Sequence, residues 1–430
     1  MYLWILVVGA ITSFFDACGI GSNDLANSFG TTYGSKILNL KQIVVIASIC
    51  EFSGALLLGS SVTSTLAGSI SNVSNFKSVP YVLMYGMLCA LGASATWIYT
   101  ATYLELPVST THSIVGGILG FSFVFKGADG VNWYKAINEF PYVSGMVPIV
   151  ISWFTSPVLT GVCCMIIYGL TRRFVIKSKN AAQRSLYLLP FIVLCTFFIE
   201  AFFIITKGAK SKLEWSVEKC VWVSSCIAGG AGLLSVGAIP FLKRRIAGMT
   251  TDQIETGEED KAEYVFKYLQ VFTSICASFA HGANDVSNSV GPFAAIWNIY
   301  QSGKVSSKID VPIWILVIGG SGIVVGLATY GLKIIKVLGE KITPITPVRG
   351  FAAELATALV VSFASRYGFP ISSTHCITGG VVAISLMDYK LSEIKWKMIG
   401  KIYLAWVFTL VITALLSGAL FAQGIYSPNV

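Results

Sequence analysis

The sequence GSNDLANS at residues 21–28 recurs as GANDVSNS at residues 282–289. A second pair follows in the same order, because LPVSTTHSIVGG at residues 106–117 recurs as FPISSTHCITGG at residues 369–380. The two pairs lie at similar separations along the chain, so duplication of one structural unit explains them better than chance composition. Corresponding polar interruptions in two apolar halves indicate a binding site between the repeats, near the middle of a bilayer.

The composition places the chain in a membrane. Of its 430 residues, 54% are hydrophobic and only 12% are charged, whereas an ordinary soluble domain has about 25% charged residues. Apolar stretches of the roughly 20 residues that a transmembrane helix needs follow one another along most of the chain. They are longer and more uniformly apolar than barrel strands, so we predict an all-α polytopic membrane protein. The net charge of +9 lies mainly in short connections, which suits membrane orientation and not nucleic-acid binding.

The apolar stretches and the motifs suggest four regions. We expect a first repeat over 1–130 with motifs at 21–30 and 106–117, intervening transmembrane helices over 131–242, a solvated cytoplasmic loop over 243–262, and a second repeat over 263–430 with motifs at 282–291 and 369–380. Within the second repeat, the stretches 263–281 and 284–300 are predicted to be separate spans. Basic clusters at 172–184 and 243–245 flank a pair of helices, so we expect both clusters on the cytoplasmic side.

The first motif pair carries carboxylates inside apolar spans. Asp24 and Asn27 have the i, i+3 spacing that places two side chains on one helix face, as do Asp285 and Asn288. A buried carboxylate needs a partner, and carboxylate and carbonyl oxygens suit hard cations. We therefore predict a site for Na⁺ or H⁺ at each motif, with the neighbouring glycines allowing the helix to unwind and present backbone carbonyls. The alternative is that these residues form helix caps or interhelical hydrogen bonds.

The second motif pair predicts helices that begin inside the membrane. Each combines a helix-start proline with capping hydroxyls and an apolar continuation. A helix N-terminus within the bilayer presents free backbone N–H groups and a positive dipole end, which together bind anions. Ordinary N-capping would also explain a single copy, but two copies beside two aspartate motifs favour a tetrahedral anion. The predicted anion ligands are Ser109, Thr110, Thr111, Ser372, Ser373 and Thr374.

Neither motif contains lysine or arginine, although hydrogen phosphate carries about −1.5 to −2 charges near neutral pH. Two nearby aspartates would repel such an anion unless cations bind with it. A site that assembles only when cation and anion are both present would couple their movements. Alternatively, a carboxylate could accept a proton carried by the phosphate, and sulfate, which lacks that proton, would then be rejected.

Further polar residues lie within or beside the apolar spans. The three histidines border the motifs, where a structural hydrogen bond is a more common role than a metal site or a proton relay. Glu51 and Glu354 are carboxylates in apolar spans and therefore candidates for gating or proton handling. Asp16 and Glu200 lack a partner in the other repeat, and nearness to a helix end would explain them. The histidines are His112, His281 and His375.

Taken together, the four motifs resemble the signatures of the inorganic phosphate transporter family, and the resemblance covers both halves of the chain. It implies about 12 transmembrane or re-entrant segments in two inverted repeats, and uptake of inorganic phosphate coupled to Na⁺ or H⁺, often by a homodimer. It further implies that Asp24, Asn27, Asp285 and Asn288 hold sodium, that the six hydroxyl residues and both asparagines contact phosphate, and that Glu51 and Glu354 occupy further functional positions. His112 and His375, which border the motifs, are secondary candidates as well.

The resemblance leads us to expect a sodium/phosphate symporter that works by alternating access, a transporter and not an enzyme, without a tightly bound cofactor, in the plasma membrane. Ser22, Ser287 and Ser373 depart from the usual residues of the family motifs, but all are small or hydroxyl-bearing. The rivals are a proton-coupled phosphate carrier, a sulfate carrier and, less favoured, a membrane hydrolase. The last lacks a Gly-x-Ser-x-Gly motif and has no need of duplicated residues.

Overall fold

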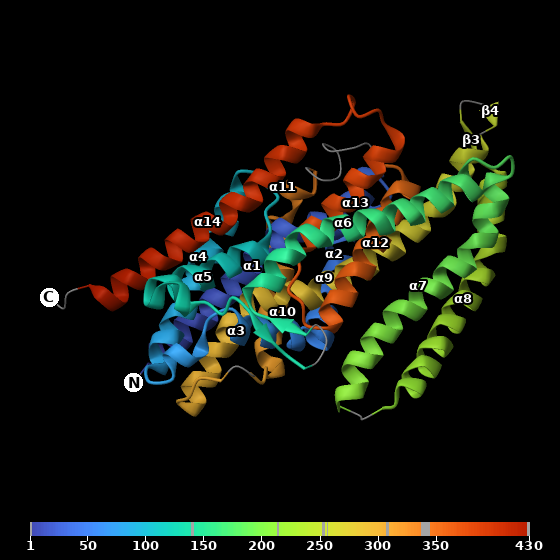
Figure 1. Ribbon diagram of the computed structural model, residues 1–430. Helices are drawn as coiled ribbons and strands as arrows, with labels where there is room; N and C mark the ends of the chain where they lie inside the picture. The colour runs from blue at the N-terminus through green and yellow to red at the C-terminus, as the bar shows by residue number, and fades with distance from the viewer. Residues whose placement is uncertain are drawn as a thin grey trace.

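The computed structural model describes residues 2–138, 142–212, 215–251, 254–255, 257–306, 309–336 and 345–427. Within this part the protein is almost entirely helical (Figure 1). The α-helices are α1 Leu3–Gly34, α2 Leu40–Leu58, α3 Ser60–Ser69, α4 Pro80–Tyr103, α5 Thr110–Lys126, α6 Met146–Thr171, α7 Ala181–Lys212, α8 Val217–Ala247, α9 Glu258–Ser302, α10 Ile313–Thr329, α11 Gly331–Lys336, α12 Pro347–Arg366, α13 Ser373–Asp388 and α14 Trp396–Tyr426.

The remaining elements are short. Strand β1, Lys135–Ala136, pairs antiparallel with β2, Val143–Ser144, and β3, Thr250–Thr251, pairs antiparallel with β4, Ile254–Glu255. Short helical turns cover Val73–Phe76, Gly127–Gly130 and Arg172–Ile176. The all-α prediction is therefore confirmed.

The helices have the lengths and surfaces of an integral membrane protein. Eight of them in the described chain are long and apolar enough to cross a membrane, and twelve have 16 residues or more, which fits the expected number of about 12 segments. Large apolar side chains face outward, such as Phe154, Leu233 and Leu234, which are 71%, 75% and 79% exposed. Such a surface is stable only against lipid.

One expectation about the first motif pair is wrong. Helix α1 runs through residues 21–28 without a break, and α9 runs through residues 282–289 as one helix of 45 residues, so 263–281 and 284–300 are not separate spans. The glycines serve close packing instead of unwinding. A Cβ atom at Gly21 would lie 2.0 Å from the carbonyl oxygen of Ile323 in α10, and one at Gly282 would lie 2.2 Å from that of Glu51 in α2.

The second motif pair does begin two short helices inside the protein. Helices α5 and α13 have 17 and 16 residues, which corresponds to about 24–26 Å, less than the roughly 30 Å of the hydrocarbon core. Their first turns are fully buried. Pro107 and Pro370 lie two residues before the capping serines and not within the first turn. Helix α5 packs against α14, and α13 packs against α6, so each short helix lies beside a long one from the other part of the chain.

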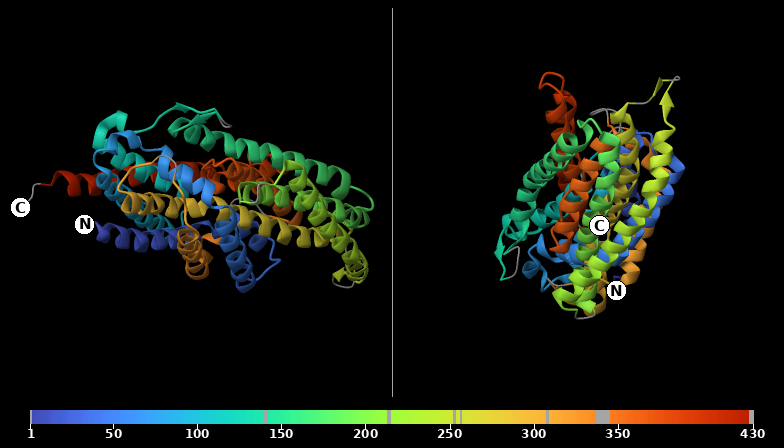
Figure 2. Two further views of the ribbon diagram at one scale, coloured as in Figure 1. Left: turned by 90° about the horizontal axis from the view of Figure 1, so that it is seen from below. Right: turned by 90° about the vertical axis from the view of Figure 1, so that its right-hand side faces the viewer.

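Helices α7 and α8 form a hairpin along one side of the bundle (Figure 1; Figure 2). They pack extensively on each other, and α7 also packs on α9 and α12. The basic residues 243–245 form part of the last helical turns of α8, which ends at Ala247, while α9 begins at Glu258. Helix therefore occupies both ends of the stretch 243–262, with β3 and β4 between them.

Candidate functional site

The two Asp–Asn pairs lie in the centre of the protein on the helices α1 and α9, which pack against each other. One helical turn separates the members of each pair, and each asparagine donates to its aspartate. The Nδ2 atom of Asn27 lies 3.0 Å from Asp24 Oδ1, and that of Asn288 lies 2.9 Å from Asp285 Oδ1. All four residues are buried. The i, i+3 spacing thus places both pairs as the sequence predicts.

The first serine of each second motif is a helix cap. Ser109 Oγ accepts from the backbone N–H of His112 at 3.2 Å, and Ser372 Oγ accepts from that of His375 at 3.3 Å. This contact stabilises the start of the short helices. The capping reading is therefore right for these two serines, and the next two hydroxyl residues of each motif reach the centre.

Those hydroxyls contact the aspartates. Thr110 Oγ1 donates to Asp24 Oδ2 at 2.8 Å, and Thr374 Oγ1 lies 3.4 Å from Asp24 Oδ1. Thr111 Oγ1 lies 3.4 Å from Asp285 Oδ1. The first aspartate is thus contacted by both short helices, and the hydroxyls of Thr110, Thr111 and Thr374 lie within the same buried centre.

The asparagines link the two halves of the site crosswise. Asn27 of the first half donates to Thr374 at 2.9 Å and to Ser373 at 3.3 Å, both in the second half. Asn288 of the second half lies 3.2 Å from the hydroxyls of both Thr110 and Thr111 in the first half. Each short helix is thereby held against the long helix of the other repeat, so the site exists only when both halves come together.

A third repeated residue, which sequence reasoning did not single out, fixes the approach to each short helix. Asn23 donates to the carbonyl of Leu106 at 3.0 Å and accepts from the N–H of Val108 at 3.0 Å. Its counterpart, Asn284, donates to the carbonyl of Ile371 at 2.8 Å. All three contacts satisfy backbone groups of non-helical chain that is at least partly buried. The recurrence of this asparagine at the same place in both motifs, as Asn23 and Asn284, could have indicated its role from the sequence.

His281 lies between the two aspartates. Its Nε2 atom is 3.2 Å from Asp285 Oδ2 and 3.6 Å from Asp24 Oδ2, and its Nδ1 is 2.6 Å from Glu51 Oε2. Glu51 also accepts from Ser278 at 3.1 Å. Asp24, His281 and Asp285 offer ligand atoms within 4.8 Å of one another, as a metal ion requires. His281 is present in only one motif copy, so the repeat gave no indication of this position.

Charge decides what this centre can bind. Two aspartates and Glu51 surround one imidazole, and in the described chain the ion pairs of these carboxylates are all with His281. Apart from the contact of Asp285 Oδ2 with His281, Asp285 Oδ2 and Asn288 Oδ1 have no polar partner within the described residues. The carboxylates therefore suit small cations. The opposing ends of α5 and α13 supply hydroxyls and positive helix N-termini, which suit an anion.

Glu354 lies in a second buried polar cluster, near the first but separate from it. Its carboxylate accepts hydrogen bonds from four hydroxyls on α1 and α9: Ser274 at 2.7 Å, Thr32 and Thr273 at 3.0 Å, and Thr31. Glu354 itself lies on α12. The cluster joins α12 to α1 and α9, the helices that carry the Asp–Asn pairs. A shift of these helices at the central site would therefore also move the residues around Glu354.

His112 and His375 have structural contacts. Their rings lie 4.6 Å apart, centroid to centroid, where α5 and α13 begin. His112 Nδ1 lies 3.3 Å from the carbonyl oxygen of Trp406 in α14, and His375 Nδ1 lies 3.0 Å from that of Trp153 in α6. Each of these bonds joins a short helix to the long helix that packs beside it, α5 to α14 and α13 to α6. The expected structural hydrogen bond is confirmed for both residues.

The sequence suggested that Asp16 and Glu200 lie near helix ends, but neither does. Asp16 lies in the middle of α1 and is wholly buried. Glu200 lies within α7 and accepts from Ser362 at 3.1 Å. Neither residue makes a hydrogen bond in the described chain to the Asp–Asn pairs.

A bundle of membrane-spanning helices with a central polar site, closed to solvent and built by two short opposed helices, defines a secondary transporter. The chain belongs to the phosphate transporter family, whose sequence profile matches residues 20–417.

Individual relatives agree with this assignment. The chain is 35% identical to the inorganic phosphate transporter 2-1, chloroplastic, of Arabidopsis thaliana, covering 94% of this chain and 69% of that one. It is 26% identical to the phosphate-repressible phosphate permease of Neurospora crassa, covering 99% and 98%. Its structure is similar to one described as the sodium-dependent phosphate transporter, with a TM-score of 0.86, 34% identity and coverage of 99% and 100%.

Proposed function

We propose that this protein takes up inorganic phosphate together with sodium ions. One observation carries the proposal: two Asp–Asn pairs, whose oxygens suit a cation, lie in one buried centre together with the N-termini of α5 and α13. The solved relative is described as sodium-dependent, which supports sodium as the coupling ion.

The residues divide into two sets. Asp24, Asn27, Asp285 and Asn288 provide carboxylate and amide oxygens for sodium, which is the ligand chemistry that hard cations prefer. The hydroxyls of the short helices and the Nδ2 groups of the two asparagines face the phosphate oxygens. The anion ligands are Thr110, Thr111, Ser373 and Thr374, while Ser109 and Ser372 cap the helix starts and thereby hold these ligands in place.

Coupling follows from charge neutralisation. Phosphate alone would meet the two aspartates, Asp24 and Asp285, whose carboxylates repel it. Sodium bound at these carboxylates would turn repulsion into attraction, so each ion raises the affinity for the other, and this effect is reciprocal by thermodynamic linkage. An empty or fully loaded site could then change its exposure to the two sides of the membrane, whereas a half-loaded one would not.

We propose alternating access by relative movement of two inverted repeats. Regions 1–130 and 263–430 remain our prediction for the extent of these repeats. The hydrogen bonds of Asn27 and Asn288 to the other half support this movement. Ion binding at one Asp–Asn pair would displace an asparagine that is bonded to the short helix of the other half. A cysteine introduced at Ser109 or Ser372 should change its reactivity towards water-soluble thiol reagents when sodium and phosphate are added, and constant reactivity would contradict the movement.

Glu51, Glu354, His112 and His375 support this function in our account without contacting phosphate. Glu51 positions His281 between the aspartates, and the two other histidines hold the short helices to α14 and α6. Glu354, surrounded by hydroxyls, offers a further oxygen-rich place for a cation.

We also propose that the protein has no enzymatic activity and that it forms a homodimer in the plasma membrane. Against a hydrolase, the rings of His112 and His375 face tryptophan carbonyls, and only their backbone N–H groups contact Ser109 and Ser372. Within the described residues, neither histidine ring is hydrogen-bonded to a serine that it could activate as a nucleophile. Light scattering of the purified protein, corrected for detergent, tests the dimer.

The test is uptake of radiolabelled phosphate into proteoliposomes under an inward sodium gradient, compared with a potassium gradient and with a proton gradient. We expect uptake with sodium only, competition by arsenate, and none by sulfate. Uptake driven only by protons would keep phosphate and replace the coupling ion. Sulfate competition as strong as that of phosphate would favour a general oxyanion carrier, and absence of uptake under every gradient would refute the proposal.

A further inference from the structure

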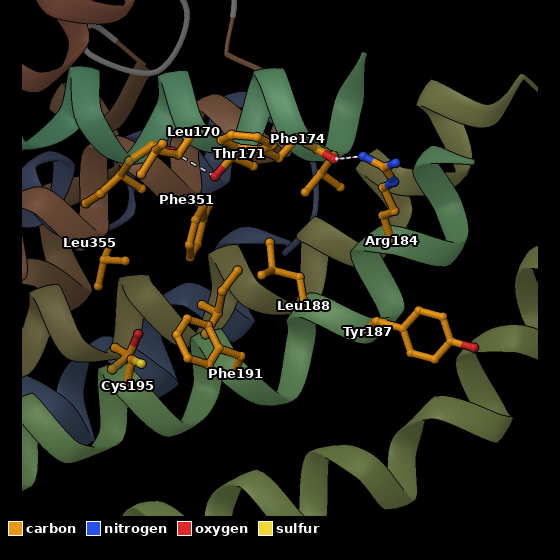
Figure 3. Close-up of a pocket in the computed structure, with 14 residues that line it drawn as sticks. Leu170, Thr171, Phe174, Arg184, Tyr187, Leu188, Phe191, Cys195, Phe351 and Leu355 are labelled. Atoms are coloured by element: carbon orange, nitrogen blue, oxygen red, sulfur yellow. Dashed lines mark hydrogen bonds between the residues drawn. The ribbon is translucent and has the colours of Figure 1, made fainter. Parts of the chain in front are cut away.

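A lateral cavity lies between α7 and the bundle, away from the central site. It has a volume of about 550 Å³ and is lined almost wholly by apolar side chains of α6, α7 and α12 (Figure 3). This volume falls within the range of roughly 300–1,000 Å³ that is typical of small-molecule sites. Its lining includes Leu188, Phe191, Cys195, Phe351 and Leu355.

One end of this cavity carries a cation. Arg184, in the first turns of α7, lines the cavity, and its Nη1 donates to the backbone carbonyl of Phe174 at 2.8 Å (Figure 3). Among the described residues Arg184 forms no ion pair with a carboxylate. Glu258, an acidic residue at the nearby start of α9, accepts instead from the backbone N–H of Ala182 at 3.2 Å. The guanidinium therefore keeps charge and donors for a ligand.

The surroundings of Arg184 place this end at a membrane boundary. It follows the basic connection between α6 and α7, where Arg173, Lys177 and Lys179 are exposed. Exposed basic residues that directly flank a transmembrane helix lie at the level of the lipid headgroups. The apolar remainder of the cavity extends from there along α7, at the depth of the hydrocarbon core.

We propose that this cavity binds one anionic phospholipid, with an acyl chain against Leu188 and Phe191 and the headgroup phosphate at Arg184. An apolar cavity in a transmembrane region with a basic residue at its headgroup end has the charge and polarity of such a lipid. The acyl chain of a phospholipid without net charge would fill the cavity equally well, but its headgroup would be attracted less strongly to the guanidinium of Arg184.

The position of the lipid gives it access to the transport machinery. Phe351 and Leu355 of α12 line the cavity, and they flank Glu354, whose carboxylate binds hydroxyls of α1 and α9. Phe351 and Leu355 lie three residues before and one residue after Glu354, so a bound chain packs on a face of α12 that adjoins the one carrying Glu354. An influence on uptake would rest on the proposed transport function, whereas lipid binding itself does not.

The experiment measures lipid binding to the purified full-length protein, without any transport. Phosphatidylglycerol or phosphatidylcholine with identical acyl chains is added in neutral detergent, and the bound lipid is counted by native mass spectrometry. For the wild type we expect about a fivefold preference for phosphatidylglycerol, the factor that corresponds to roughly 1 kcal/mol per basic residue at an anionic headgroup.

Three variants locate the site. Arg184→Gln should abolish the preference, while Lys179→Gln, a matched loss of charge in the adjoining connection and outside the cavity, should retain it. Leu188→Trp, which fills the cavity without changing charge, should reduce binding of both lipids, and elution as a single peak in size exclusion checks that each variant is folded. Equal preference in Arg184→Gln and the wild type would overturn the proposal, as would a loss in Lys179→Gln as large as in Arg184→Gln, or full lipid binding by Leu188→Trp.

A final arm separates a lipid headgroup from the free anion. Millimolar inorganic phosphate should leave the bound phosphatidylglycerol in place, because the acyl chain holds the lipid in the apolar cavity. Displacement of the lipid by inorganic phosphate would show that Arg184 binds a free anion and would refute the lipid assignment.

Discussion

Replacing Thr110 by valine tests the central contacts with little change of shape. Its hydroxyl donates to Asp24 at 2.8 Å and lies 3.2 Å from the amide nitrogen of Asn288, so it joins a cation ligand of one half to the asparagine of the other. Valine has nearly the same volume but cannot form either bond. The side chain is 2% exposed, so water cannot easily replace the lost hydroxyl.

The expected magnitude follows from the charged partner. A hydrogen bond to a charged group contributes roughly 1.5–3 kcal/mol, which corresponds to about a 10- to 150-fold change in an equilibrium constant. We therefore expect Thr110→Val to reduce the initial rate of phosphate uptake at least tenfold when sodium and phosphate are both well below saturation. Thr110→Ser keeps the hydroxyl and should stay within about threefold of the wild type by the same reasoning.

The assay is the initial rate of radiolabelled phosphate uptake into proteoliposomes, normalised to the amount of reconstituted protein. Thr100→Val is the matched control, because Thr100 is exposed on α4 and, among the described residues, its hydroxyl bonds only to the carbonyl of Thr96 in its own helix. Uptake by Thr110→Val within twofold of that by Thr100→Val would refute the role that we give to this hydroxyl.

Two further substitutions test how the helices around the site are held. Gly282→Ala would place a Cβ atom 2.2 Å from a backbone carbonyl oxygen of α2, so it should destabilise the protein by roughly 1–3 kcal/mol or more. Thermal unfolding in detergent checks this: the melting temperature of Gly282→Ala should lie well below that of Gly237→Ala, because nothing lies within 4 Å of a Cβ atom at Gly237. Arg349→Met removes one of two arginines that clamp the buried Asp388, at 2.7 Å from Arg349 and 2.8 Å from Arg172. Because Arg172 remains, we expect a loss near the lower end of the roughly 3–5 kcal/mol found for breaking buried pairs, and a melting temperature unchanged by Arg349→Met would contradict the clamp.

Local patterns predicted the parts of the site that depend on short spacings. The i, i+3 spacing placed Asp24 with Asn27 and Asp285 with Asn288 on one helix face, and both pairs form hydrogen bonds. The capping hydroxyls likewise predicted the start of α5 and α13 at the second motifs. Both features follow from backbone geometry within a few residues, which a single sequence contains.

The contacts between the halves could not be predicted in the same way. Nothing local indicates that Asn27 reaches Thr374, or that His281, one helical turn from Asp285, also approaches Asp24 of the other half. The motif glycines misled the prediction, because glycine permits both an unwound backbone and a close helix contact. Which one occurs depends on the facing helix: a carbonyl lies too close to Gly21 and to Gly282 for any side chain.

The most direct test of the account is equilibrium binding of radiolabelled phosphate to the purified protein, in sodium and in potassium at equal ionic strength. We predict saturable binding in sodium, at least tenfold weaker binding in potassium, and loss of the sodium dependence in both Asp24→Asn and Asp285→Asn. Equal binding in the two salts, or sodium-dependent binding that survives in both variants, would contradict the claim that the paired aspartates hold the cations that bring phosphate into the site.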